Sequence, residues 1–160
     1  MSTLQVHGTC VAFEDGAVLL RGPSGAGKSD LAFRLVTEQG GQLVADDQVC
    51  LEIQKDVLLA RAKEGWSGLI ELRGLGIVSV PSTPSAPLTL LVDLVDQDEV
   101  PRLAEPLYDE LIGHRLPILR LHAFDATTAA KVKLAVTHIP GTGASSAKAD
   151  GFPGDDGRLG

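Results

Sequence analysis

The chain has 160 residues, of which 44% are apolar and 22% are charged, and its formal net charge is −7. This length and composition allow one sizeable hydrophobic core, and the negative charge argues against a basic surface for nucleic acid or acidic membranes. No apolar run approaches the roughly 20 residues that span a bilayer, and residues 1–10 lack a signal-peptide pattern, so the sequence predicts a cytoplasmic protein without nucleic-acid or membrane partners.

The first third of the chain alternates between strand patterns and one helix pattern. Strands are expected at 4–13 and 17–21, joined as a hairpin by a Glu-Asp-Gly turn. A glycine-rich loop at 22–29 leads into a helix at 29–39, which two consecutive glycines end. The apolar face of this helix is expected to be Leu31, Ala32, Leu35 and Val36.

The remainder is predicted to be mostly strands, followed by one helix. Further strands are expected at 42–45, 49–53, 57–62, 69–80, 88–95 and 116–121. Residues 63–68 are interpreted as a mobile loop and 81–87 as a surface connector. Asp125 is expected to cap a helix over 126–139. The apolar face of that helix is predicted to be Ala129, Val132, Val136 and Ile139.

The composition changes at the end of the chain. Residues 140–160 are rich in Gly, Ser and Asp, which is typical of a disordered tail, so the folded domain is predicted to be 1–139. The two cysteines, Cys10 and Cys50, each lie in a strand pattern. In a cytosolic protein this favours buried free thiols, and a disulfide between them stays open.

The sequence GPSGAGKS matches the phosphate-binding pattern G-x-x-x-x-G-K-[ST]. Its glycines let the backbone amides point at phosphate oxygens, and the following helix adds its positive N-terminal end. Lys28 is expected to reach the β- and γ-phosphates, and the Ser29 hydroxyl to ligate Mg²⁺. A strand before the motif and a helix after it favour this over a plain glycine-rich turn. The predicted nucleotide-binding residues are Gly22, Pro23, Ser24, Gly25, Ala26, Gly27, Lys28 and Ser29.

A phosphate loop of this kind needs a carboxylate near the metal, and two places offer one. Asp93 ends an apolar run, as an ordinary Walker B acid would, whereas Asp46 and Asp47 close the strand that follows the loop helix. Adjacent carboxylates are costly unless a cation compensates them, although a solvated turn would also tolerate them. The residues alone leave both places open.

The segment IELRGLGIVSV combines charged residues with glycines in a strand pattern. Glu71 and Arg73 are two positions apart, hence on one face of an extended strand, and Gly74 and Gly76 leave that face uncluttered. Close approach by a ligand explains this better than a half-exposed edge strand does. His7 is likewise a lone polar residue in a strand, for which a structural role is the simpler interpretation.

Four segments together resemble the catalytic domain of the HPr kinase/phosphorylase family: HGTCV at 7–11, GPSGAGKSD at 22–30, LVADDQV at 43–49 and IELRGLGIVSV at 70–80. The resemblance implies an α/β fold with a mixed sheet and flanking helices, similar to phosphoenolpyruvate carboxykinase around the loop. It implies a Mg²⁺- and ATP-dependent serine kinase that acts on the phosphocarrier HPr or a nitrogen-type relative. Members of the family also reverse the reaction with inorganic phosphate, and they are typically hexamers.

The resemblance also implies roles for the undecided residues. Asp47 matches the carboxylate that takes the serine proton, Asp46 lies beside it, and His7 matches a histidine near this pair. Glu71 matches a second Mg²⁺ ligand beside Ser29, while Arg73 belongs to the same catalytic strand as Glu71. Asp93 then becomes a structural residue.

Two departures from the family pattern qualify the prediction. The chain is expected to be a short form without the family's N-terminal domain. The basic loop that family members carry late in the domain has no counterpart here, since 117–121 lead straight into the last predicted helix region, and Arg115 and Arg120 are the nearest basic residues. The reverse, phosphate-dependent reaction is therefore the less supported direction. Two alternatives stay open: an ATP-sensing regulator that transfers nothing, and a small-molecule phosphotransferase.

Overall fold

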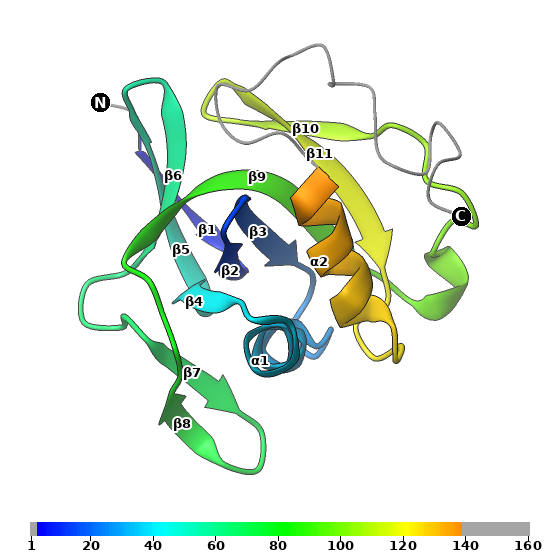
Figure 1. The fold of residues 1–160 in the computed structure, drawn as a ribbon, viewed down its shortest axis with the longest axis horizontal. Helices are drawn as coiled ribbons and strands as arrows, with labels where there is room; N and C mark the ends of the chain where they lie inside the picture. Colours follow the sequence, from blue (N-terminus) through cyan, green and yellow to red (C-terminus); the bar gives the residue numbers. More distant parts are fainter. Residues whose placement is uncertain (1–2, 139–160) are drawn as a thin grey trace.

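The computed structural model describes residues 3–138 as a mixed sheet with two helices on one face, which confirms the predicted α/β class (Figure 1). The helices are α1 (Lys28–Gln39) and α2 (Thr128–His138), with a short 3₁₀ turn, η1, at Gln97–Glu99. The strands are β1 (Thr3–His7), β2 (Thr9–Phe13), β3 (Gly16–Arg21), β4 (Gln42–Ala45), β5 (Gln48–Gln54), β6 (Val57–Ala62), β7 (Leu69–Leu72), β8 (Gly76–Ser79), β9 (Ser85–Leu94), β10 (Tyr108–Leu111) and β11 (His114–Leu121).

The predicted strand over 4–13 is two strands, which is a correction. β1 pairs with β5, whereas β2 pairs with β3 and β4. Gly8 separates them, because a Cβ there would lie 2.7 Å from the Leu20 carbonyl oxygen. The chain therefore crosses close to β3 at this point and changes partner, which no alternation of apolar residues reveals. The β2–β3 hairpin itself is confirmed.

The sheet is organised around β9, the strand predicted to be central. The strand order is β1-β5-β6-β9-β3-β2-β4, and β11 pairs with the second half of β9. β3 and β11 are both parallel to β9, while β2 is antiparallel to β3 and to β4. Consequently β3, β4, β9 and β11 all point in one direction, and their carboxyl ends meet at the same edge of the sheet.

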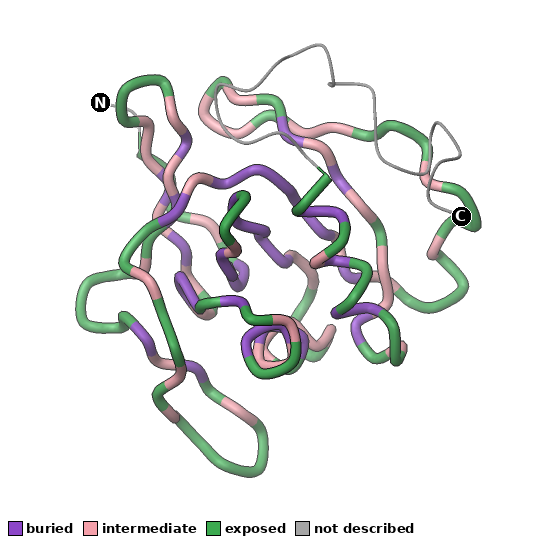
Figure 2. Tube along the Cα trace, in the orientation of Figure 1, coloured by how far each residue is buried: buried purple, intermediate pink, exposed green. Residues whose placement is uncertain are grey.

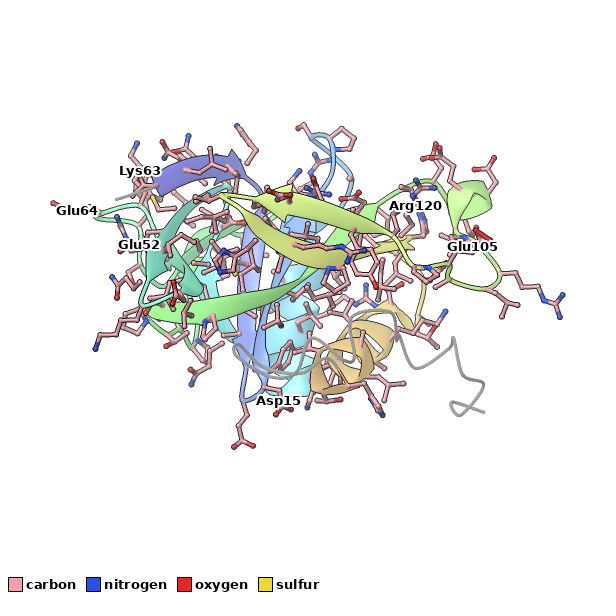
Figure 3. All side chains as sticks on the ribbon, turned by 90° about the horizontal axis from the view of Figure 1, so that it is seen from above. Asp15, Glu52, Lys63, Glu64, Glu105 and Arg120 are labelled. Carbon is pink, nitrogen blue, oxygen red and sulfur yellow. The ribbon has the colours of Figure 1, made fainter. Side chains whose placement is uncertain are left out.

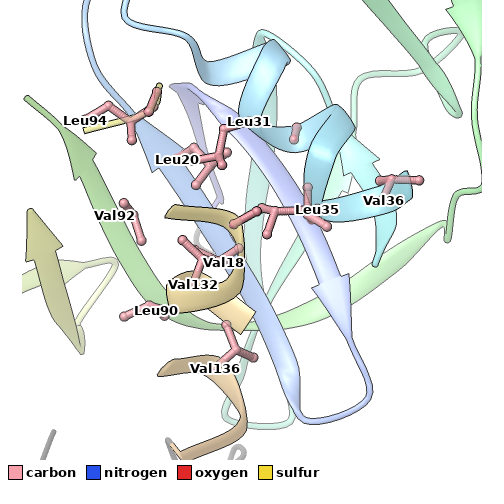
Figure 4. Close-up of a cluster of buried hydrophobic side chains, with 14 of the residues drawn as sticks. Val18, Leu20, Leu31, Leu35, Val36, Leu90, Val92, Leu94, Val132 and Val136 are labelled. Atoms are coloured by element: carbon pink, nitrogen blue, oxygen red, sulfur yellow. The ribbon is translucent and has the colours of Figure 1, made fainter. Parts of the chain in front are cut away.

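Alternating side chains of the central strands face two separate cores, as a two-sided sheet requires. Figure 4 shows the core under the helices, where Val18 and Leu20 of β3 meet Leu31 and Leu35 of α1. Their neighbour Leu19 faces the opposite core. Burial on both sides makes β3 and β9 the inner strands of the molecule (Figure 2), and it holds the residues that follow β3 on a rigid base.

The two helices follow the predicted patterns with differences at their ends. The four predicted apolar positions of α1 are its buried residues, and Gly40 ends the helix in a left-handed conformation, with φ 76°. α2 begins at Thr128, two residues later than predicted, and the Asp125 carboxylate accepts a hydrogen bond from Gln97 Nε2 instead. Ala129, Val132 and Val136 are buried as predicted. Ile139 and residues 140–160 lie outside the described residues.

The predicted strand over 69–80 is a hairpin of β7 and β8, largely exposed in Figure 2. Arg73 lies in the turn between the strands and not in one strand with Glu71. The prediction that the two side chains share a strand face is therefore wrong. The cause is that Gly74 and Gly76, at φ 94° and 93°, turn the chain instead of leaving a flat face.

Two composition-based predictions can be compared with the structure. Cys10 and Cys50 are both free. Cys10 is fully buried, which raises the pKa of its thiol, whereas Cys50 is only half-buried, so the prediction of a buried thiol is wrong for Cys50. Among residues 3–138 there is no helix with the length and apolarity that crossing a bilayer requires.

Candidate functional site

The phosphate loop connects the end of β3 to the start of α1 at the sheet edge where the four parallel carboxyl ends meet. Gly25 and Gly27 have φ of 86° and 98°, which L-residues rarely adopt. Among the described residues, the amides of Gly25, Gly27 and Lys28 donate to no backbone carbonyl. They are the free donors that a helix start presents, and such donors bind phosphate oxygens.

Lys28 folds back over the loop that precedes it. Its Nζ atom donates to the carbonyl oxygens of Gly22, at 2.6 Å, and of Pro23, at 3.1 Å. The ammonium group therefore lies above the glycine loop, where the predicted nucleotide phosphates would be. Gly22 is tightly packed, since a Cβ there would lie 3.2 Å from the Leu94 carbonyl oxygen at the end of β9.

Asp46 is the carboxylate that the fold brings to the loop. Ser29 Oγ donates to Asp46 Oδ1 at 2.7 Å, and the hydroxyl of Thr9 donates to the same oxygen at 3.0 Å. The backbone amide of Glu71 donates to Asp46 Oδ2 at 3.2 Å. Three segments, from β2, α1 and β7, thus converge on one side chain at the end of β4, which fixes its position against Ser29.

Thr9 is a site residue that the sequence analysis missed. It is fully buried at the start of β2, and its hydroxyl is satisfied by Asp46. The available signal was a hydroxyl residue inside the apolar pattern of HGTCV, because a buried hydroxyl needs a partner. Identifying that partner as Asp46 required the pairing of β2 with β4.

Asp47 occupies the centre of a three-residue turn between β4 and β5. The Gln48 amide donates to the Asp46 carbonyl oxygen at 2.8 Å, and φ of Asp47 is 71°. This conformation is strained for an L-residue, and such strain is typical of functional sites. The turn directs the Asp47 carboxylate to solvent, 3.7 Å from His7 Nδ1, with both side chains more than 70% exposed. His7 and the aspartate pair are thus neighbours, as predicted.

Glu71 lies beside this site by its backbone, and its side chain is exposed. Arg73 is displaced to the exposed hairpin turn. Among residues 3–138, no three His, Cys, Asp or Glu side chains cluster closely enough to hold a metal ion. Mg²⁺ commonly takes one or two protein oxygens and completes its shell with phosphate and water. The paired Ser29 hydroxyl and Asp46 carboxylate are a donor set of that kind.

Asp93, the other candidate acid, forms an ion pair with Arg21. Arg21 Nε and Nη2 donate to its two oxygens at 2.7 and 3.2 Å, and Arg21 Nη1 donates to Asp109 at 2.8 Å. Burial lowers the pKa of Arg21, but the bonds to both carboxylates outweigh this and leave it raised. The bond from Arg21 lowers the pKa of Asp109. The ion pair of Asp93 with Arg21 supports the structural role that the resemblance implied.

A hollow of about 460 Å³ lies elsewhere on the surface. It is lined by residues that include Phe13 at the end of β2, Gly40 at the end of α1 and Gln42 at the start of β4. These positions are at the edge of the sheet opposite the phosphate loop. The chemistry-bearing residues therefore lie on an open edge and not in this hollow.

The arrangement of a parallel strand, a phosphate loop and a helix, with an acid held at the loop serine, defines the class of P-loop kinase folds. More specifically, the chain belongs to the family described as HPr Serine kinase C-terminal domain, whose profile matches residues 1–104. This confirms the family resemblance of the four segments.

Relatives and a solved structure agree with this assignment. The chain is 44% identical over 81 residues to the HPr kinase/phosphorylase of Bacillus subtilis, covering 49% of the chain and 25% of that protein. It is 39% identical over 102 residues to that of Geobacillus thermodenitrificans, covering 58% and 32%. The structure of the Hpr(Ser) kinase/phosphatase from Coxiella burnetii has the same fold, with a TM-score of 0.72 at 23% identity over 81% of this chain and 86% of that one. The chain thus spans about a quarter to a third of the length of these two sequence relatives.

Proposed function

We propose that this protein is an ATP-dependent serine kinase whose acceptor is the phosphocarrier HPr or a nitrogen-type relative of it. The observation that carries the proposal is the hydrogen bond from Ser29 to Asp46. Asp47 follows Asp46 directly in the sequence, which supports a position for this proposed proton acceptor near the residues proposed to bind phosphate. Membership of the HPr Serine kinase C-terminal domain family supports the choice of acceptor.

The residues present fit a nucleoside triphosphate with Mg²⁺. The free amides of the loop and the Lys28 ammonium group would bind the phosphate oxygens, with Lys28 exchanging its carbonyl partners for them. Ser29 and Asp46 would hold the metal, and Glu71, whose backbone amide contacts Asp46, is proposed as a further ligand. The metal, when bound, neutralises charge on the transferred phosphoryl group.

Transfer then requires one proton acceptor near the incoming hydroxyl. We propose that Asp47 takes the proton of the acceptor serine while the hydroxyl oxygen of that serine bonds to the γ-phosphorus. The bond between the γ-phosphorus and the oxygen that bridges it to the β-phosphate breaks, and ADP is released. The Asp47 carboxylate is exposed to an approaching protein, and the His7 side chain lies beside it. In the reverse direction the same carboxylate would return the proton, with inorganic phosphate as the acceptor.

A transfer assay tests this proposal. The protein is mixed with ATP radiolabelled on its γ-phosphate and with purified HPr, with and without excess inorganic phosphate. We expect label on a serine of HPr. We expect Lys28→Ala to abolish the labelling, and Asp47→Asn to slow it by about 10² to 10⁴ while ATP affinity is kept. Asp15→Asn is the matched control, since Asp15 lies at the tip of the β2–β3 hairpin (Figure 3).

The outcomes separate the alternatives. ATP binding with no label on HPr, and with equal partner binding by wild type and Asp47→Asn, would identify a nucleotide-sensing regulator. Label on a small molecule but not on HPr would identify a small-molecule phosphotransferase. Loss of ATP binding in Asp47→Asn would show that Asp47 is a metal ligand or a structural residue and not the proton acceptor.

A further inference from the structure

Phe124 is an exposed aromatic residue that lies against the phosphate loop. Its side chain is in the segment between β11 and α2 and is 58% exposed. A Cβ at Gly27 would lie 2.8 Å from the ring atom Cζ of Phe124, so the ring touches the backbone where α1 begins. Figure 1 shows this segment beside the start of α1. Phe124 has no part in the proton transfer proposed for Asp47.

The segment that carries Phe124 is held firmly on both sides of it. Arg34 of α1 donates from Nη1 to the Ala123 carbonyl oxygen at 2.6 Å and from Nη2 to the Asp125 carbonyl oxygen at 3.0 Å. The Asp125 carboxylate is bound by Gln97, which follows β9. The exposed ring of Phe124 therefore lies on a fixed segment that is tied to α1 and to η1.

The strand order determines which end of a nucleotide would reach this ring. In the proposed binding mode, the γ-phosphate lies near Ser29 and Asp46, which are on the β4 side of β3. β9 and β11 lie on the other side of β3, and Phe124 follows the carboxyl end of β11. Ligands of open α/β sheets bind outside the carboxyl ends of the strands. A phosphate chain that crosses the loop from the aspartates therefore leaves its nucleoside on the side of Phe124.

We propose that Phe124 is the stacking platform for the base of the bound nucleoside triphosphate, with a purine as the fitting base. The inference rests on the proposed function, because it needs phosphates in the loop. A flat ring offers a π-face to any base, and a purine covers more of it than a pyrimidine does. His122 contacts Phe124 in a T-shaped pair, with ring centroids 5.8 Å apart at an interplanar angle of 73°, so the two rings are not stacked in parallel. Phe124 lies beyond residue 104, where the family match ends.

The test compares ligands with and without a base. Phe124→Leu keeps an apolar contact with Gly27 but has no aromatic face, and Phe124→Trp restores one. Binding of ATP, GTP and inorganic triphosphate, each with Mg²⁺, is measured by calorimetry. We expect Phe124→Leu to bind ATP and GTP about tenfold more weakly and inorganic triphosphate as wild type does. We expect Phe124→Trp to bind all three as wild type does.

Each remaining outcome is decisive. Equal ATP affinity in wild type and Phe124→Leu overturns the stacking role and leaves the kinase proposal intact. Equal weakening for ATP and inorganic triphosphate also overturns it, because the substitution would then have distorted the loop. If wild-type protein binds neither ATP nor inorganic triphosphate, both proposals fail. Leu134→Ala is the matched control, since Leu134 is an exposed apolar residue on α2, and we expect its binding to be that of wild type.

Discussion

At the scale of single residues, the two adjacent aspartates have different environments, which supports the different roles proposed for them. Asp46 is half-buried and accepts hydrogen bonds from Ser29, Thr9 and the Glu71 amide, so it is positioned but not free to approach an acceptor. Asp47 is exposed and occupies a left-handed turn. The local conformation thus gives the two side chains different surroundings although they are neighbours in sequence, which supports the metal-binding role proposed for Asp46 and the proton-accepting role proposed for Asp47.

The strain at Asp47 predicts that stability and activity can be separated. Glycine adopts a φ of 71° without penalty, whereas alanine keeps the Cβ that makes it unfavourable, at a cost of about 1 to 2 kcal/mol. We therefore expect Asp47→Gly to unfold at higher urea concentration than Asp47→Ala. Both variants should lose transfer activity by about 10² or more, because neither has a carboxylate. Higher stability of the alanine variant would show that the turn relaxes without strain.

At the scale of elements, the start of α1 is positioned by its contact with the segment before α2. Gly27 has no room for a side chain, because a Cβ would lie 2.7 Å from the Cβ of Ala123. Gly25, in the same loop, has a similar positive φ but nothing within 4 Å of a Cβ. Gly25 is therefore needed only for its backbone conformation, whereas Gly27 is needed for its backbone conformation and for close packing against Ala123.

Alanine at these two positions separates the purposes. Gly25→Ala should lower the free energy of unfolding by about 1 to 2 kcal/mol, which is the cost of a left-handed alanine. Gly27→Ala should lower the free energy of unfolding by about 1 to 3 kcal/mol more than Gly25→Ala does, because the added methyl group overpacks the contact with Ala123. It should also weaken triphosphate binding, because the start of α1 must shift. Urea unfolding and calorimetry measure the two effects. Equal losses of stability in the two variants would contradict the packing argument.

At the scale of the whole molecule, one ion-pair cluster joins strands that are distant in sequence. Arg21 at the end of β3 binds Asp93 of β9 and Asp109 of β10. The next residue, Gly22, begins the phosphate loop and supplies the carbonyl oxygen that Lys28 binds. The cluster therefore ties the later part of the chain to the base of the loop.

The charge on Asp109 makes this tie sensitive to acid. The bond from Arg21 lowers the pKa of Asp109 below its ordinary value of 3.8. The stabilisation is therefore present above about pH 4 and is lost as the pH falls through the lowered pKa. We expect Asp109→Asn to lower Tm at pH 7 by a few degrees at most, since the pair is partly exposed and worth up to about 1 kcal/mol.

Thermal unfolding of wild type and Asp109→Asn between pH 7 and pH 2.5 checks this expectation. The difference in Tm between the two proteins should shrink below pH 4 and disappear at the acid end. Glu105→Gln serves as the control, because Glu105 is an exposed carboxylate in the loop before β10 (Figure 3), and its Tm should follow that of wild type. If the difference in Tm between wild type and Asp109→Asn stays constant with pH, the contribution of Asp109 to stability comes from packing and not from its charge.

Local patterns predicted much of this structure because they act over a few neighbouring residues. The phosphate loop, the apolar face of α1, the β2–β3 hairpin and the central strand β9 depend on glycine positions and on the period of apolar residues. The paired aspartates were also recognised at the correct strand end. Their separate roles are proposals that the environment of each carboxylate supports.

Tertiary structure alone decided which distant segments meet at the sheet edge. Asp46 and Asp93 end comparable strands, and only the strand order and the side chain of Arg21 assign one to the loop serine and the other to an ion pair. Similarly, Arg73 lies in a turn and not in the predicted strand. The parallel pairing of β11 with β9 places Phe124 next to Gly27. The physical reason is that strand order and register depend on contacts between residues far apart in the sequence, which local patterns do not encode.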